Sequence, residues 1–184
     1  MKYLIVPVGS SCVGKTYLYN NLIKNNKSTS FSIDALYRNF FSEKISNDYI
    51  EPEQKKNFAF FLIEEIQKEL DNSLIEVFYL DSTILSLKED RDFIFKHLKY
   101  NSEDMILIFI NFKISFEQIL NNHEKRYFSI LEKLKQKDSL EWRKKIPYIS
   151  KEKLFKLYSD VVFVTKEEVE NYSFKDVFIF NIEG

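Results

Sequence analysis

The residues best suited to chemistry lie near the start of the chain, in a loop with glycine at its first and sixth positions. The eight residues are Gly9, Ser10, Ser11, Cys12, Val13, Gly14, Lys15 and Thr16. They match the pattern G-x-x-x-x-G-K-[ST], whose backbone N–H groups surround the phosphates of a nucleotide. In this pattern the lysine reaches the β- and γ-phosphates, and the threonine hydroxyl is a ligand of Mg²⁺. The sequence therefore predicts that this phosphate loop binds ATP and Mg²⁺, and that Lys15 takes part in catalysis.

The segments on either side of the loop support this interpretation. An apolar run at residues 3–8 predicts a buried strand, and the residues from Lys15 to about Asn25 predict a helix. The positive end of the helix dipole would then face the bound phosphates. A plain turn before a helix is the alternative, but such a turn needs neither both glycines nor the Lys-Thr pair.

Two further acidic residues follow predicted strands, and ligands of open α/β sheets bind at the carboxyl ends of strands. Asp34, after a strand at residues 29–33, is a candidate general base for an acceptor hydroxyl, or an N-cap of the next helix. Arg38, four residues later, would bind a phosphate of the acceptor or pair with Asp34. Asp81, after a strand at residues 76–80, is a candidate Mg²⁺ ligand or a turn residue. Thr83 would contact the acceptor or cap the local backbone.

A basic segment in the second half of the chain predicts a lid at about residues 123–147. Between 133 and 145 the basic residues are Lys133, Lys135, Lys137, Arg143, Lys144 and Lys145, against Asp138 and Glu141. A lid needs cations because negative charge develops on the transferring phosphoryl group. Arg126, at the start of this segment, is the candidate that would stabilise the transition state. A solvated helix face is the alternative explanation of the charge.

Predicted strands and helices alternate along the whole chain, which indicates an α/β fold with a parallel sheet covered by helices on both faces. The expected strands are 2–8, 29–33, 76–80, 105–110 and 177–182. The expected later helices are about 34–41, 52–70, 87–100, 115–126 and 150–158. Leu, Ile, Phe and other apolar residues make up 45% of the 184 residues, which is enough for the core of a single domain.

The remaining composition excludes several classes of protein. A formal net charge of −1 argues against bulk attraction to a polyanion as the main mode of binding. One cysteine excludes an internal disulfide and is typical of a reducing cytosol. No signal peptide or membrane-spanning run is visible, so we expect a cytoplasmic protein with no membrane partner.

Together these residues resemble the 5′-hydroxyl polynucleotide kinase family of P-loop kinases. The resemblance rests on Gly9 to Thr16, Asp34 with Tyr37-Arg38, Asp81-Ser82-Thr83 with Arg91, Ser115 to Gln118 followed by Lys125-Arg126, Ile146 to Ser150, Leu157-Tyr158, and Val164 to Glu168. It covers most of the chain. The family has D-x-x-R after the second strand, whereas Asp34 and Arg38 are four residues apart.

The resemblance implies a P-loop kinase-type parallel sheet of about five strands with a helical lid, in one domain at residues 1–184. It implies ATP and Mg²⁺ on Lys15 and Thr16, Asp34 as the base, Arg38 on the acceptor phosphate, Asp81 in the active site, and Arg126 on the phosphoryl group. The expected reaction is phosphorylation of a 5′-hydroxyl end of RNA or DNA in nucleic-acid repair, with any ligase or phosphatase on a separate protein. Two alternatives stay open: a kinase of a nucleoside, nucleotide or other small hydroxyl metabolite, and a nucleotide-binding switch without transfer activity.

Overall fold

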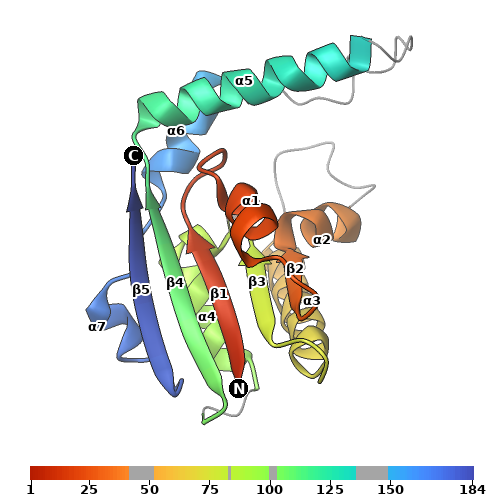
Figure 1. The fold of residues 1–184 in the computed structure, drawn as a ribbon, viewed down its shortest axis with the longest axis vertical. Coiled ribbons are helices and arrows are strands. Elements are labelled where there is room, and N and C mark those ends of the chain that lie inside the picture. Colours follow the sequence, from red (N-terminus) through yellow and green to blue (C-terminus); the bar gives the residue numbers. More distant parts are fainter. Residues whose placement is uncertain (42–51, 83, 100–102, 136–148) are drawn as a thin grey trace.

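The computed structural model describes residues 1–41, 52–82, 84–99, 103–135 and 149–184 (Figure 1). It contains one five-stranded sheet in which every neighbouring pair of strands is parallel. The strands are β1 (Lys2–Val8), β2 (Ser28–Ser32), β3 (Val77–Asp81), β4 (Met105–Lys113) and β5 (Asp176–Glu183). Their order across the sheet is β2-β3-β1-β4-β5. The predicted parallel α/β fold is therefore confirmed, with the strand that precedes the phosphate loop at the centre.

Helical segments connect the strands. They are α1 (Lys15–Leu18), the π-helical η1 (Tyr19–Ile23), α2 (Ile33–Phe40), α3 (Pro52–Leu70), the 3₁₀ segment η2 (Ile84–Ser86), α4 (Lys88–His97), α5 (Phe116–Lys135), α6 (Lys151–Ser159) and α7 (Lys166–Val169). No described helix is both long enough and apolar enough to span a bilayer.

Three helix predictions differ from the structure. The first helix changes to π-helical form at Tyr19 and ends at Ile23, because Lys24 adopts an extended ψ of 122°. The helix expected to end at Arg126 continues as α5 to Lys135, and no glycine or proline interrupts it. The short helix α7 was not predicted, since four residues carry too little periodicity.

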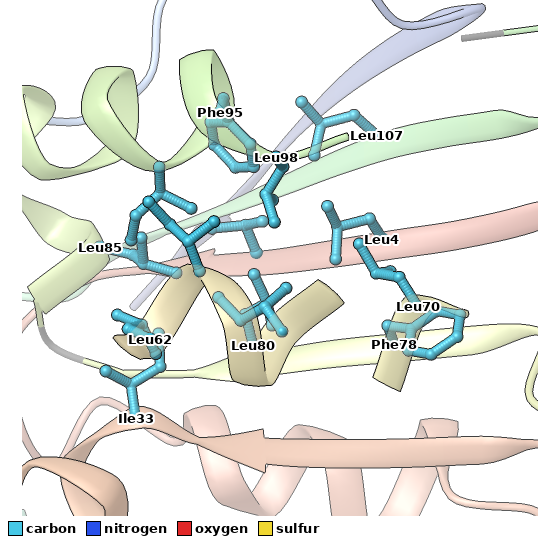
Figure 2. Packing of buried hydrophobic residues seen from close by; sticks show 14 of the residues in the cluster. Leu4, Ile33, Leu62, Leu70, Phe78, Leu80, Leu85, Phe95, Leu98 and Leu107 are labelled. Atoms are coloured by element: carbon cyan, nitrogen blue, oxygen red, sulfur yellow. The ribbon is translucent and has the colours of Figure 1, made fainter. Parts of the chain in front are cut away.

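The main core lies between one face of the sheet and helices α3 and α4. Because side chains alternate across a strand, Leu4, Val6 and Val8 of β1 all point to this face and are fully buried. Figure 2 shows the packing of this cluster. Sheet residues Leu4, Phe78, Leu80 and Leu107 pack against Leu62 and Leu70 of α3, Phe95 of α4, and Leu98 at the C-cap of α4. On the opposite face Tyr19 packs against Ile5 and Tyr79. β1 and β3 are buried on both faces. Because all the strands are parallel, their carboxyl ends lie together at one end of the sheet, and this end carries the phosphate loop.

Candidate nucleotide-binding site

The phosphate loop follows β1 and has the backbone conformation that its glycines predict. Gly14, just before α1, has φ 104°, a left-handed value that an L side chain rarely adopts. Cys12 has φ 64° without being glycine. At Gly9 space is the constraint, since an added Cβ would lie 3.0 Å from Cβ of Phe112 on β4. Both glycines are therefore required by the fold of the loop itself.

Lys15 lies folded back over the phosphate loop. Its side-chain ammonium donates to the carbonyl oxygens of Gly9 at 2.6 Å and Ser10 at 2.8 Å, and the residue is only 7% exposed. Ser10 is also buried, and its hydroxyl has no hydrogen-bond partner among the residues that the structure describes. A buried polar group without a partner is costly. A phosphate oxygen bound in the loop would satisfy the Ser10 hydroxyl and take up the charge of Lys15.

Thr16 and Asp81 meet at the end of the loop. The Thr16 hydroxyl donates to the Asp81 carboxylate at 2.8 Å, which joins the start of α1 to the end of β3. The two residues predicted to bind Mg²⁺ therefore lie in direct contact. A hydroxyl and a carboxylate are the hard oxygen donors that Mg²⁺ prefers, and Mg²⁺ is commonly held by one or two protein ligands plus phosphates and water. The described residues contain no group of three or more acidic, His or Cys residues that could hold a metal ion, so a two-ligand site fits what is present.

Two residues that the sequence does not predict form hydrogen bonds to the backbone of the phosphate loop. Ser86, in η2, accepts a hydrogen bond from the Gly9 N–H at 2.9 Å and donates to the Gly9 carbonyl oxygen at 2.8 Å. The Tyr79 hydroxyl donates to the carbonyl oxygen of Lys15 at 2.7 Å. Burial, and secondly the charge of Asp81, raise the pKa of Tyr79, so its hydroxyl stays protonated as a donor. No sequence motif marks these residues, because a serine or tyrosine beside a strand end has many possible roles.

Helix α5 is tied to the loop by Asn122. Its side-chain amide donates to the carbonyl oxygen of Cys12 at 3.1 Å, and Gln118 donates to the Asn122 side-chain oxygen at 3.2 Å. Val13 and Ile119 belong to one buried apolar cluster in the same region. Arg126 follows Asn122 by four residues on α5 and is exposed. Four residues of helix rise about 6 Å, so Arg126 lies about one turn beyond the contact with the loop.

A buried ion pair supports η2, the segment that carries Ser86. Arg91 of α4 donates to both carboxylate oxygens of Glu168 at 2.8 and 2.9 Å, and to the carbonyl oxygen of Leu85 at 2.9 Å. Arg91 is fully buried and Glu168 is 5% exposed. Tyr172 also donates to Glu168, at 2.9 Å. The network links α4 and α7 to the residue next to Ser86.

The side chains predicted to act on the acceptor lie outside what the structure describes. Asp34 and Arg38 lie one turn apart on α2, and the backbone of these residues is described but not their side chains. Because α2 begins at Ile33, Asp34 lies in its first turn and is not the N-cap. Thr83 and the segment 136–148, which holds the second half of the predicted lid, lie outside the described residues, whereas the first half of the lid belongs to α5. The described part of the site therefore consists of the phosphate loop, with Lys15 and Thr16, and of Asp81.

Comparison with known proteins identifies similar folds and no close relative. No protein-family model matches the sequence. No curated protein matches it. A chain in the structure of the Pnkp1/Rnl/Hen1 RNA repair complex aligns with 86% of this chain at 18% identity and a TM-score of 0.54. The aligned part is 43% of that chain, so this protein spans less than half of its length.

Two further structures align over nearly the whole chain. A sugar kinase from Janibacter sp. has 10% identity and a TM-score of 0.56, with 98% of this chain and 85% of that chain covered. A presumed kinase from Chloroflexus aurantiacus has 13% identity and a TM-score of 0.52, with 99% and 85% covered. Identities this low show the fold alone. The strand order, the phosphate loop after β1 and these similarities together show that the chain has the fold of P-loop kinases.

Proposed function

We propose that this protein transfers the γ-phosphoryl group of ATP to a 5′-hydroxyl end of RNA or DNA. The proposal of phosphoryl transfer rests on the 2.8 Å hydrogen bond between Thr16 and Asp81, together with the buried Lys15 of the phosphate loop. The acceptor is supported by the resemblance of the sequence to 5′-hydroxyl polynucleotide kinases and by the similar chain in an RNA repair complex. A ligase or phosphatase acting on the same ends would be a separate partner.

In the proposed reaction the acceptor oxygen attacks the γ-phosphorus, and the bond from phosphorus to the β–γ bridging oxygen breaks. ADP leaves with the electron pair of that bond, and Asp34 takes the proton of the acceptor hydroxyl. Thr16 and Asp81 would hold Mg²⁺, which neutralises charge on the phosphate oxygens. Lys15 binds the β- and γ-phosphates, Arg126 stabilises the charge that develops on the transferring group, and Arg38 binds the acceptor phosphate.

A second candidate function is phosphorylation of a sugar, nucleoside or other small alcohol. The alignment with the sugar kinase supports it, since that alignment covers 85% of the sugar kinase and has a TM-score of 0.56. Both functions use the same loop, metal site and base, and differ only in the acceptor.

The test is an acceptor panel with γ-labelled ATP and Mg²⁺. The acceptors are 5′-hydroxyl oligoribonucleotides and oligodeoxyribonucleotides, nucleosides, nucleoside monophosphates and common sugars. Label on the oligonucleotides is the expected result. Label only on small acceptors would refute the polynucleotide proposal in favour of the second candidate. ATP binding without label on any acceptor would leave a nucleotide-binding switch.

Asp34→Asn tests the base within the same panel. Since the amide cannot take the proton, transfer should fall about 10²- to 10⁴-fold while ATP affinity stays close to wild type. Asp160→Asn, at the exposed C-cap of α6, is the matched control and should leave both unchanged. An equal loss of ATP binding and transfer in Asp34→Asn would make Asp34 a structural residue.

A further inference from the structure

The two edge strands of the sheet differ in length and chemistry. β2 has five residues, and all except Phe31 are serine or threonine. β5 has eight residues and contains no lysine, arginine or proline. Short polar edge strands, prolines and lysines are the common means of preventing pairing between sheets. The β5 edge has none of these features, and no other strand among the described residues pairs with it.

β5 also carries exposed aromatic side chains on one face. Phe178 is 47% exposed and Phe180 is 54% exposed. The register with β4 places them beside Ile108 and Ile110, which are half-buried. In Figure 1, α1 lies in front of β1 and β3, while no described helix covers β4 and β5 along most of their length on that side. The exposed phenylalanines therefore sit on the part of the sheet with the least helical cover.

We propose that β5 pairs antiparallel with β5 of a second copy of this chain, forming a two-fold symmetric dimer with a continuous sheet. In an antiparallel pair, two residues directly opposite each other either both point their backbone N–H and C=O groups at the partner strand or both point them away from it. Along one strand this direction alternates from residue to residue. The numbers of opposite residues must therefore add to an even value. Two registers satisfy this condition and come closest to full overlap of residues 176–183. One places residue 179 on the two-fold axis, and the other places residue 180 there.

Pairing of opposite charges favours the register with Ile179 on the axis. That register places Lys175 opposite Glu183 of the second copy, twice by symmetry, and both residues are exposed. It also places Phe178 opposite Phe180 of the second copy on the same face, where a cross-strand aromatic pair contributes roughly 0.2–1 kcal/mol. With residue 180 on the axis, Asp176 lies opposite Gly184 and no ion pair forms. Backbone hydrogen bonds and the phenylalanines supply the affinity, since each exposed ion pair adds little.

Light scattering coupled to size exclusion tests the proposal, with the full chain at a series of concentrations. The expected mass is twice that of the 22.1 kDa chain, falling to 22.1 kDa on dilution. Phe180→Glu should give a monomer. Lys175→Glu should raise the dimer dissociation constant about tenfold, because two attractive pairs become repulsive. The double variant Lys175→Glu with Glu183→Lys should restore it.

Leu22→Glu is the matched control, since Leu22 of η1 is 75% exposed and lies outside β5. It should leave the dimer unchanged, and every variant should bind ATP like wild type, which shows that it is folded. A monomer at every concentration would overturn the proposal. So would a dimer that persists in Phe180→Glu, and failure of the double variant to restore association would overturn the register.

Discussion

At the residue scale, the site depends on a few contacts between groups far apart in the sequence. Thr16 and Asp81 are 65 positions apart and meet at 2.8 Å. Both could be selected as candidates from the sequence, because one belongs to a specific motif and the other ends a buried strand. Ser86 could not be predicted, since its hydrogen bonds to Gly9 depend on the path of η2 and not on any local pattern.

Replacing Thr16 by valine keeps the shape of the side chain and removes the hydroxyl that Asp81 accepts from. Transfer should fall about 10²- to 10³-fold, because one preorganised contact to the metal and phosphate site is lost. The rate at saturating ATP, measured over a Mg²⁺ titration, checks this. The half-buried Thr29→Val on β2 is the control and should keep the wild-type rate. A Thr16→Val protein with an unchanged Mg²⁺ dependence would remove Thr16 from the metal site.

Ser86→Ala should weaken both the fold and the loop. The change leaves the buried N–H of Gly9 without its partner and removes one of the two hydrogen bonds to the Gly9 carbonyl oxygen, a loss of about 1–3 kcal/mol in the free energy of unfolding. Urea denaturation measures the stability and fluorescence titration measures ATP affinity, and both should fall. The exposed Ser129→Ala on α5 serves for comparison. Wild-type ATP affinity in Ser86→Ala would show that the loop does not need this support.

At the element scale, α5 matters most for the proposed reaction. The sequence predicts its start and the position of Arg126, but the helix ends at Lys135 and not at the predicted Arg126. Its attachment to the loop through Asn122 is a tertiary contact that no helix pattern reveals. The order of the strands also depends on tertiary contacts, since the pairing of β4 with β5 joins segments 70 residues apart.

Asn122→Ala should reduce kcat about tenfold and change ATP affinity little. Removal of the bond to Cys12 frees the start of α5, and Arg126 lies one turn beyond it. Steady-state kinetics with separate kcat and KM values checks this. Asn121→Ala, exposed on the next position of α5, is the matched control. Loss of stability with an unchanged kcat would assign Asn122 to packing alone.

The ion pair between α4 and α7 gives a prediction on stability. Arg91→Met leaves the Glu168 carboxylate buried without its partner, so the free energy of unfolding should fall by about 3–5 kcal/mol. The double variant Arg91→Met with Glu168→Leu removes both charges and should be clearly more stable than the single variant. Urea denaturation compares the two. Equal destabilisation by both would show that the hydrogen bond to Leu85, and not the charge pairing, is what matters.

At the scale of the whole molecule, the alternation of strands and helices was sufficient to predict a parallel α/β sheet. The glycine loop located the end of the sheet that carries the candidate nucleotide-binding site. Local patterns do not show which face of the sheet lacks helical cover. The exposed Phe178 and Phe180 read as ordinary strand residues in the sequence, and only the register and exposure of β5 distinguish them. The fold in turn supports a phosphotransferase and leaves the acceptor to experiment.

The most direct test is transfer of label from γ-labelled ATP to one oligonucleotide prepared with either a 5′-hydroxyl or a 5′-phosphate. Mg²⁺-dependent label is expected on the 5′-hydroxyl form alone. Lys15→Ala should lose that label, because Lys15 carries the charge that the loop offers to the phosphates. Equal labelling by Lys15→Ala, or no labelling of the 5′-hydroxyl end by the wild-type protein, would contradict the proposed function.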